Sequence, residues 1–97
     1  MKVELTEEAR AQVNEIDAWW RANRRAAPDL FAAELDQALA MLEASPTLGS
    51  PYVARATRVR RLLLPRTHYH LYVSDGVDRV FVVAVWSVFR GRGPRVW

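Results

Sequence analysis

The feature that most constrains the fold is a nearly unbroken apolar run late in the chain, over residues 79–89 (RVFVVAVWSVF). Most of its residues are β-branched or aromatic, an Asp-Gly turn signal precedes it, and Arg-Gly-Arg-Gly-Pro follows it. A short strand that is apolar at almost every position, and not only at every second one, is typical of a strand covered on both faces. We therefore expect a central β-strand over residues 79–89, around which the other elements pack.

Two amphipathic helices are expected before this strand. Thr6 can cap the first, with acidic residues in the first turn, and its pattern ends in the polar segment 21–25. Pro28 suits the first turn of the second helix, which Ser45 and Pro46 end. The short connection predicts an antiparallel helical hairpin. The apolar faces comprise Ala9, Val13, Ile16 and Trp20 in the first helix, and Phe31, Leu35, Ala38, Leu39 and Leu42 in the second.

The rest of the chain reads as short strands and turns. Alternation predicts strands over residues 2–5, 58–64 and 67–74, and a loop over 45–57. A turn over 75–78 would allow Gly76 a positive φ. The expected fold class is α+β: a short N-terminal strand, a two-helix antiparallel hairpin and three antiparallel strands, in one small domain over residues 1–97.

Composition excludes several kinds of chemistry. The 97 residues contain no cysteine, so disulfides, thiol catalysis and thiolate metal sites are absent. His68 and His70 are the only histidines and cannot complete a zinc site alone, so we expect neither a metal nor another cofactor. No apolar segment reaches the ~20 residues that span a bilayer, and the first residues do not resemble a signal peptide. These features predict a cytoplasmic protein with no membrane partner.

Charge is divided unevenly along the chain. Residues 1–50 carry five basic and nine acidic side chains, a balance of −4, whereas residues 51–97 carry nine arginines and two aspartates, a balance of +7. Arginine keeps its charge and offers a planar fork that suits phosphates and carboxylates. The pattern indicates a polyanion or an acidic protein as partner, with an ordinary soluble surface as the alternative.

The helical hairpin is followed by VRRLLLPRTHYHLYV, an Asp-Gly turn and VFVVAVWSVFRGRGP. This order of segments resembles the RelE/ParE superfamily of bacterial toxins over nearly the whole chain. The resemblance implies the toxic component of a type II toxin–antitoxin module, which causes growth arrest and stabilises plasmids, held in a hetero-oligomer with its cognate antitoxin. RelE-like members cut mRNA on the ribosome without a metal, and ParE-like members inhibit DNA gyrase.

The residues after the last strand favour the ParE-like branch. Metal-free RNA cleavage requires groups that exchange protons, a task that arginine performs poorly. The ribonuclease branch tends to carry His, Tyr or Lys there, whereas this chain has Ser87 and Phe89. We therefore expect a gyrase inhibitor and not an enzyme. The alternatives are a RelE-like endoribonuclease acting on ribosome-bound mRNA through His68, His70 and Arg61, and a non-toxic corepressor bound to the antitoxin.

Two groups of residues are candidates for binding. The arginines around the last strands are expected to form one positive surface for the target, with charge that merely keeps a sheet edge soluble as the alternative. Trp19, at the edge of its helical stripe, and Trp97 are expected to be exposed and to contact the antitoxin. The histidines are otherwise polar residues on a strand surface that faces solvent or the antitoxin. The expected target-binding arginines are Arg60, Arg61, Arg66, Arg90 and Arg92.

Overall fold

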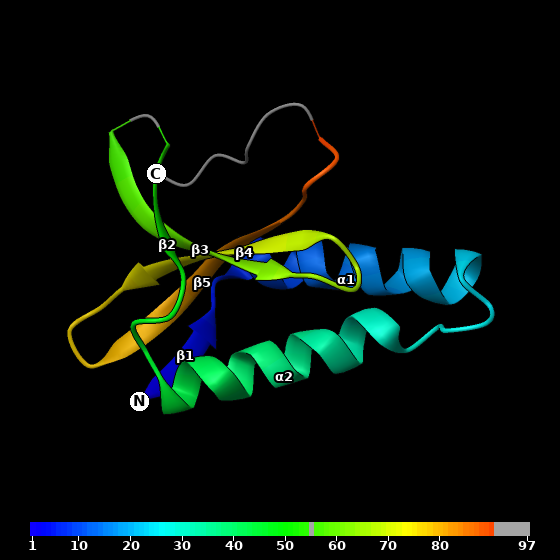
Figure 1. Cartoon of the computed structure of the whole chain (residues 1–97), viewed down its shortest axis with the longest axis horizontal. Helices are drawn as coiled ribbons and strands as arrows, with labels where there is room; N and C mark the ends of the chain where they lie inside the picture. Colours follow the sequence, from blue (N-terminus) through cyan, green and yellow to red (C-terminus); the bar gives the residue numbers. More distant parts are fainter. Residues whose placement is uncertain (55, 91–97) are drawn as a thin grey trace.

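The computed structural model describes residues 1–54 and 56–90 and has the expected α+β architecture (Figure 1). Its strands form one sheet in the order β1-β5-β4-β3-β2. The helical hairpin and the N-terminal strand are confirmed. The elements are β1 (Lys2–Leu5), α1 (Glu7–Asn23), α2 (Leu30–Ala44), β2 (Ser50–Ala54), β3 (Thr57–Leu64), β4 (Tyr69–Asp75) and β5 (Arg79–Ser87).

The apolar run forms β5, which lies between β1 and β4. Its neighbour β4 is antiparallel, but β1 is parallel, so the sheet is mixed and not purely antiparallel. The short β1 pairs only with the first half of β5, and the Thr6 amide extends this pairing by donating to the Val82 carbonyl at 3.0 Å. Among the described residues, the later part of β5, from Val83 onward, therefore pairs with β4 on one side and with no strand on the other, which leaves an open edge.

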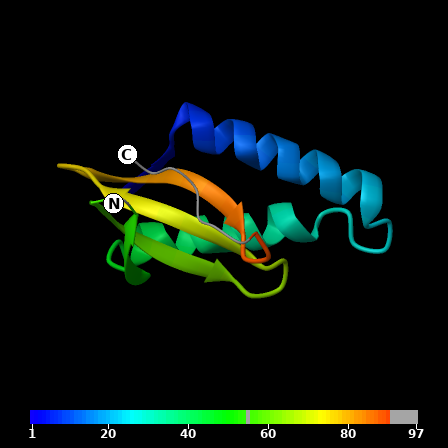
Figure 2. The same cartoon turned by 90° about the horizontal axis from the view of Figure 1, so that it is seen from above.

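Both helices pack on the same face of the sheet and run alongside each other, as Figures 1 and 2 show. The predicted apolar stripes supply this core, with Phe31 and Leu42 completely buried. Thr6 caps α1 as expected, because its hydroxyl accepts a hydrogen bond from the Ala9 amide at 3.2 Å. Tyr69 links both helices to the sheet. Its ring meets Phe31 edge-on at 5.2 Å, and its hydroxyl accepts a hydrogen bond from the Trp20 indole at 3.3 Å.

A buried carboxylate joins α2 to the turn between β3 and β4. Glu34 is 6 % exposed, although it lies among the apolar residues of α2. Its two oxygens accept hydrogen bonds from the amide of Arg66 at 2.7 Å, the amide of Thr67 at 2.9 Å and the hydroxyl of Thr67 at 2.6 Å. The turn is therefore fixed to α2 by three hydrogen bonds to one side chain.

The predicted loop over residues 45–57 was wrong, because it contains strand β2. This strand pairs antiparallel with β3 at the sheet edge, in the register Pro51↔Arg60 and Tyr52↔Val59. Proline cannot donate a ladder hydrogen bond and is tolerated on an edge strand, so Pro51 does not interrupt the pairing. Four strands, and not three, therefore follow the helical hairpin.

Three local expectations also need correction. Helix α2 begins at Leu30, with Asp29 at the N-cap position but without a capping hydrogen bond from its side chain, so Pro28 lies in the preceding turn. Gly76 does not have a positive φ; a Cβ there would lie 2.8 Å from the Phe81 ring, so the turn needs glycine for space. Strand β4 begins only at Tyr69, because His68 lies in the turn with a φ of 65°.

Candidate functional site

The sheet face opposite the helices carries a row of aromatic and basic side chains. Because side chains alternate along a strand, residues that face one another across paired strands share a face. The register Arg61↔Tyr72 and His70↔Trp86 places these four residues on the helix-free face. A bulge in the β4–β5 pairing at Tyr72 and Val73 shifts the alternation by one residue, so that Val80 and Val82 face the helices, whereas Ala84 and Trp86 face away from them. Strand β5 thus presents apolar groups to both faces, as its sequence predicted.

The centre of this face is held together by stacked rings. Tyr52 and Tyr72 pack edge-to-face with ring centroids 5.3 Å apart, and the Arg61 guanidinium lies 4.6 Å from the Tyr52 centroid. His70 lies against the other side of Tyr72, with ring centroids 6.2 Å apart. Tyr72 is only 2 % exposed, whereas Tyr52, Arg61 and His70 are partly exposed. These side chains form a basic, aromatic surface with a buried tyrosine beneath it.

The same arrangement shifts two pKa values. Burial lowers the pKa of His70 below its ordinary value of 6.5, and the nearby positive charge of Arg61 lowers it further. Burial raises the pKa of the Tyr72 hydroxyl, and hydrogen bonding to Arg61 partly opposes this effect. Both shifts favour the neutral form near pH 7. His70 is therefore available as a proton acceptor, but no described residue completes an acid–base pair with it at hydrogen-bonding distance.

A second cluster lies where the β3–β4 turn meets the end of β5. The Arg90 guanidinium lies 4.2 Å from the Trp86 ring centroid. Phe89 is 79 % exposed, and its ring is tilted against that of His68 at 5.3 Å. The Val88 amide donates to the His68 carbonyl at 3.0 Å, which ties the two segments together. A large exposed aromatic residue beside an arginine is a common feature of binding surfaces.

The predicted target-binding arginines do not all lie together. Arg61 is on the helix-free face, Arg90 covers Trp86 at its end, and Arg66 is exposed in the β3–β4 turn. The neighbouring Arg60 points to the other face, where it forms an ion pair with Asp75 at 2.6 Å and donates to the Leu48 carbonyl. Arg92 lies outside the described residues.

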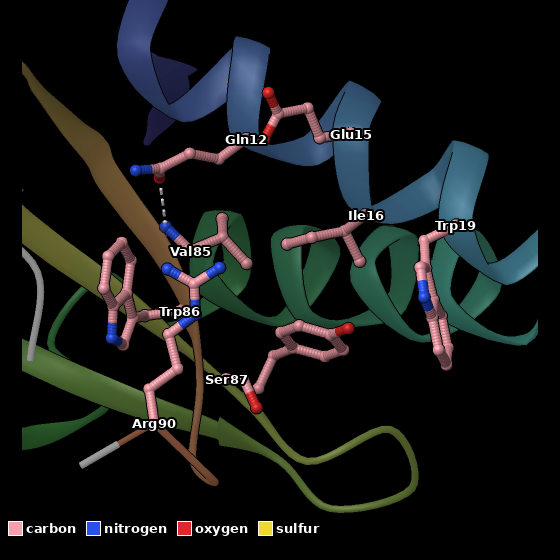
Figure 3. Close-up of a pocket in the computed structure, with 9 residues that line it drawn as sticks. Gln12, Glu15, Ile16, Trp19, Val85, Trp86, Ser87 and Arg90 are labelled. Atoms are coloured by element: carbon pink, nitrogen blue, oxygen red, sulfur yellow. Dashed lines mark hydrogen bonds between the residues drawn. The ribbon is translucent and has the colours of Figure 1, made fainter. Parts of the chain in front are cut away.

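A groove of about 480 Å³ runs between α1 and the open edge of β5 (Figure 3). Gln12 reaches across it, and its side-chain oxygen accepts a hydrogen bond from the Val85 amide at 2.8 Å. Trp19, which is 46 % exposed, lies at one end, and Arg90 lies at the other. The α1 wall of the groove thus combines the polar Gln12 and Glu15 with the apolar Ile16 and Trp19, and the edge of β5 forms its floor. The other predicted antitoxin contact, Trp97, lies outside the described residues.

Several residues of these surfaces had no signal in the sequence. Tyr52 lies in the segment that was predicted to be a loop, and Gln12 is an ordinary polar residue beside an apolar helical stripe. Within residues 1–54 and 56–90, no group of three or more His, Cys, Asp or Glu side chains could hold a metal ion. None of the helices in the described part is long and apolar enough to cross a membrane.

The helical hairpin thus covers one face of a mixed five-stranded sheet, and the basic aromatic residues lie on the opposite face. A solved structure described as the chromosomal ParDE TA system from P. aeruginosa has the same fold, with a TM-score of 0.67 at 16 % identity. The match covers 91 % of this chain and 96 % of that one. A search of curated proteins found no significant match.

The family is shown by the sequence itself. Residues 3–90 match the family described as ParE toxin of type II toxin-antitoxin system, parDE. The chain therefore belongs to the ParE toxin family, in agreement with the resemblance found in the sequence. Membership of a toxin–antitoxin family implies an antitoxin as partner.

Proposed function

We propose that this protein is a toxin that inhibits DNA gyrase in the cytoplasm and is neutralised by a cognate antitoxin. The observation that carries the proposal is the match to the ParE toxin family over residues 3–90, which includes every helix and strand of the fold except the first residue of β1. Inhibition by binding requires a complementary surface and no proton transfer. The arginine-bearing face supplies such a surface without a recognisable catalytic centre.

The chemistry of the described residues supports binding over RNA cleavage. From Val85 to Arg90 the chain contains no Asp, Glu, His, Lys or Tyr side chain that could exchange a proton near pH 7. His68 packs on Phe89, while His70 packs on Tyr72, so the two histidines have different surroundings. General acid–base catalysis needs two such groups held around one reacting phosphate. The different surroundings of His68 and His70 therefore favour binding over a shared acid–base pair.

The proposed target surface comprises Arg61, Arg66 and Arg90, which are accessible on or beside the helix-free face. Arg60 has a structural role in this proposal, because its charge is already paired with Asp75. The proposed antitoxin contact is Trp19 at the mouth of the α1–β5 groove. A half-exposed tryptophan beside a groove is suited to anchor a partner, since tryptophans often dominate binding energies. The two surfaces meet at Arg90.

Two assays run in parallel test the proposal. Purified protein is added to gyrase during DNA supercoiling, and to ribosomes translating a defined mRNA. We expect inhibition of supercoiling, loss of this inhibition in Arg61→Gln, and full inhibition by the double variant His68→Gln/His70→Gln. Arg25→Gln, which removes the same charge from an exposed site after α1, is the matched control. Normal supercoiling together with ribosome-dependent mRNA cuts that require His70 would show that the protein is a ribonuclease.

A further inference from the structure

Positive charge gathers at the end of the sheet near the β3–β4 turn, where strands β3, β4 and β5 carry no acidic side chain. The only carboxylates in residues 56–90 are Asp75 and Asp78, which lie at the opposite end of β4 and β5. They pair there with Arg60 and Arg79. In the described part of the chain, Arg61, Arg66 and Arg90 form no ion pair. Their charges therefore remain available to an anionic ligand.

The same end exposes planar rings. Phe89 is 79 % exposed and packs against His68, and the Arg90 guanidinium lies over the Trp86 ring, 4.2 Å from its centroid. Exposing a phenylalanine to water is unfavourable, and this ring is not drawn into the core even though Val88 beside it is partly buried. Exposed rings beside arginines match a ligand that carries both flat bases and phosphates.

The geometry distinguishes among anionic ligands. An acidic peptide would engage the arginines but would gain little from Phe89 and His68, because Asp and Glu side chains carry no aromatic ring to stack on them. A nucleic-acid duplex presents phosphates, but its bases are already stacked on one another. Unpaired bases can lie on aromatic rings while the backbone contacts arginine. Single-stranded nucleic acid is the ligand that uses both features.

We propose that this surface, the arginine–aromatic end, binds single-stranded nucleic acid, with phosphates on the arginines and a base stacked on the Phe89–His68 pair. It comprises Arg66, His68, Trp86, Phe89 and Arg90, and Arg61 adds a further cation from the centre of the helix-free face. This inference goes beyond gyrase inhibition and does not rest on it, because nucleic acid is bound directly by the toxin. The backbone of the turn is fixed by Glu34, so the surface is largely formed before the ligand arrives.

Fluorescence anisotropy of the purified full-length chain tests the inference without gyrase or ribosomes. The probes are a labelled oligothymidine of about 12 nucleotides, a duplex of the same length and an oligoglutamate peptide of similar charge. We expect the single strand to bind at least several times more tightly than the other two. Phe89→Ala should weaken its binding about tenfold, because stacking on one ring is lost. Arg90→Gln should lower the slope of log affinity against log salt by about 0.7.

Matched controls separate the surface from general attraction. Met41→Ala removes an exposed apolar side chain from α2, and Arg10→Gln removes a charge from α1; both should leave the affinity within about twofold, as expected for sites away from the ligand. The proposal is overturned if the single strand does not bind, if oligoglutamate binds equally well, or if Phe89→Ala behaves like Met41→Ala. Because Phe89 and Arg90 are exposed, their variants should remain folded, which circular dichroism checks.

Discussion

Glu34 offers a direct test of how the turn that carries Arg66 and His68 is held. Its carboxylate accepts three hydrogen bonds, two of them from Thr67, and both residues are 6 % exposed. Hydrogen bonds to charged groups contribute roughly 1.5–3 kcal/mol each, and buried donors left without partners add a similar cost. The Arg66 amide is only partly buried and can bind water after the change. Glu34→Ala should therefore destabilise the fold by about 3–5 kcal/mol.

Urea unfolding followed by circular dichroism measures this loss. For a total stability of about 5–15 kcal/mol, the midpoint should fall by a large fraction of its original value. Thr67→Val, which removes only the hydroxyl bond, should cost about 1–3 kcal/mol. Glu43→Ala, at an exposed position of the same helix, should change stability by less than about 0.5 kcal/mol. If Glu34→Ala and Glu43→Ala unfold at the same urea concentration, the three hydrogen bonds do not stabilise the protein.

The remaining predictions concern pH, backbone strain and the antitoxin. The folded protein holds the pKa of His70 below 6.5, so the folded chain binds a proton at His70 more weakly than the unfolded chain does. The contribution of neutral His70 to stability is therefore complete above about pH 6.5 and is lost as the pH falls through the folded pKa. On acidification, the urea midpoint should fall less steeply in His70→Gln than in His68→Gln. Gly49→Ala should lower the free energy of unfolding by at least about 1 kcal/mol in the same assay, because the φ of Gly49 is +106° and the new Cβ would lie 3.2 Å from the Arg61 carbonyl oxygen. An unchanged urea midpoint would contradict that backbone conformation. Trp19→Ala should weaken binding of the cognate antitoxin about thirtyfold in calorimetry without unfolding the protein. The control Val77→Ala, at a fully exposed turn position, should leave the affinity unchanged. Equal affinities of the two variants would show that Trp19 is not part of the interface.

The fold could be predicted where one physical signal dominated. The β-branched run of β5 and the helical spacing of the two stripes supplied most of the core, as expected. Strand β2 escaped prediction because its pairing with β3 is a tertiary contact, and Pro51 marks a loop as readily as a sheet edge. The buried Glu34 escaped because its partners are backbone amides about thirty residues away, which no local pattern reveals.

The candidate site was harder to predict than the fold. Arg60 and Arg61 are neighbours on one strand, so the alternation of side chains places them on opposite faces, and a single surface cannot contain both. The expectation that His68 and His70 share a strand face depended on the strand starting at residue 67, but the turn extends through His68. Exposure of Phe89 could not be inferred either, since the apolar pattern continues past the point where β5 ends.

The pairing of β1 with β5 also determines when the toxin can exist during its own synthesis. The first strand pairs with Arg79–Val82, far along the chain, so the helices and sheet cannot close around a common core until the ribosome has made the chain through β5. Such distant pairings form late in folding, after the cost of closing the long intervening segment has been met. A partly made chain consequently cannot display the complete sheet face, and an antitoxin already present in the cell can meet each toxin molecule as it finishes folding.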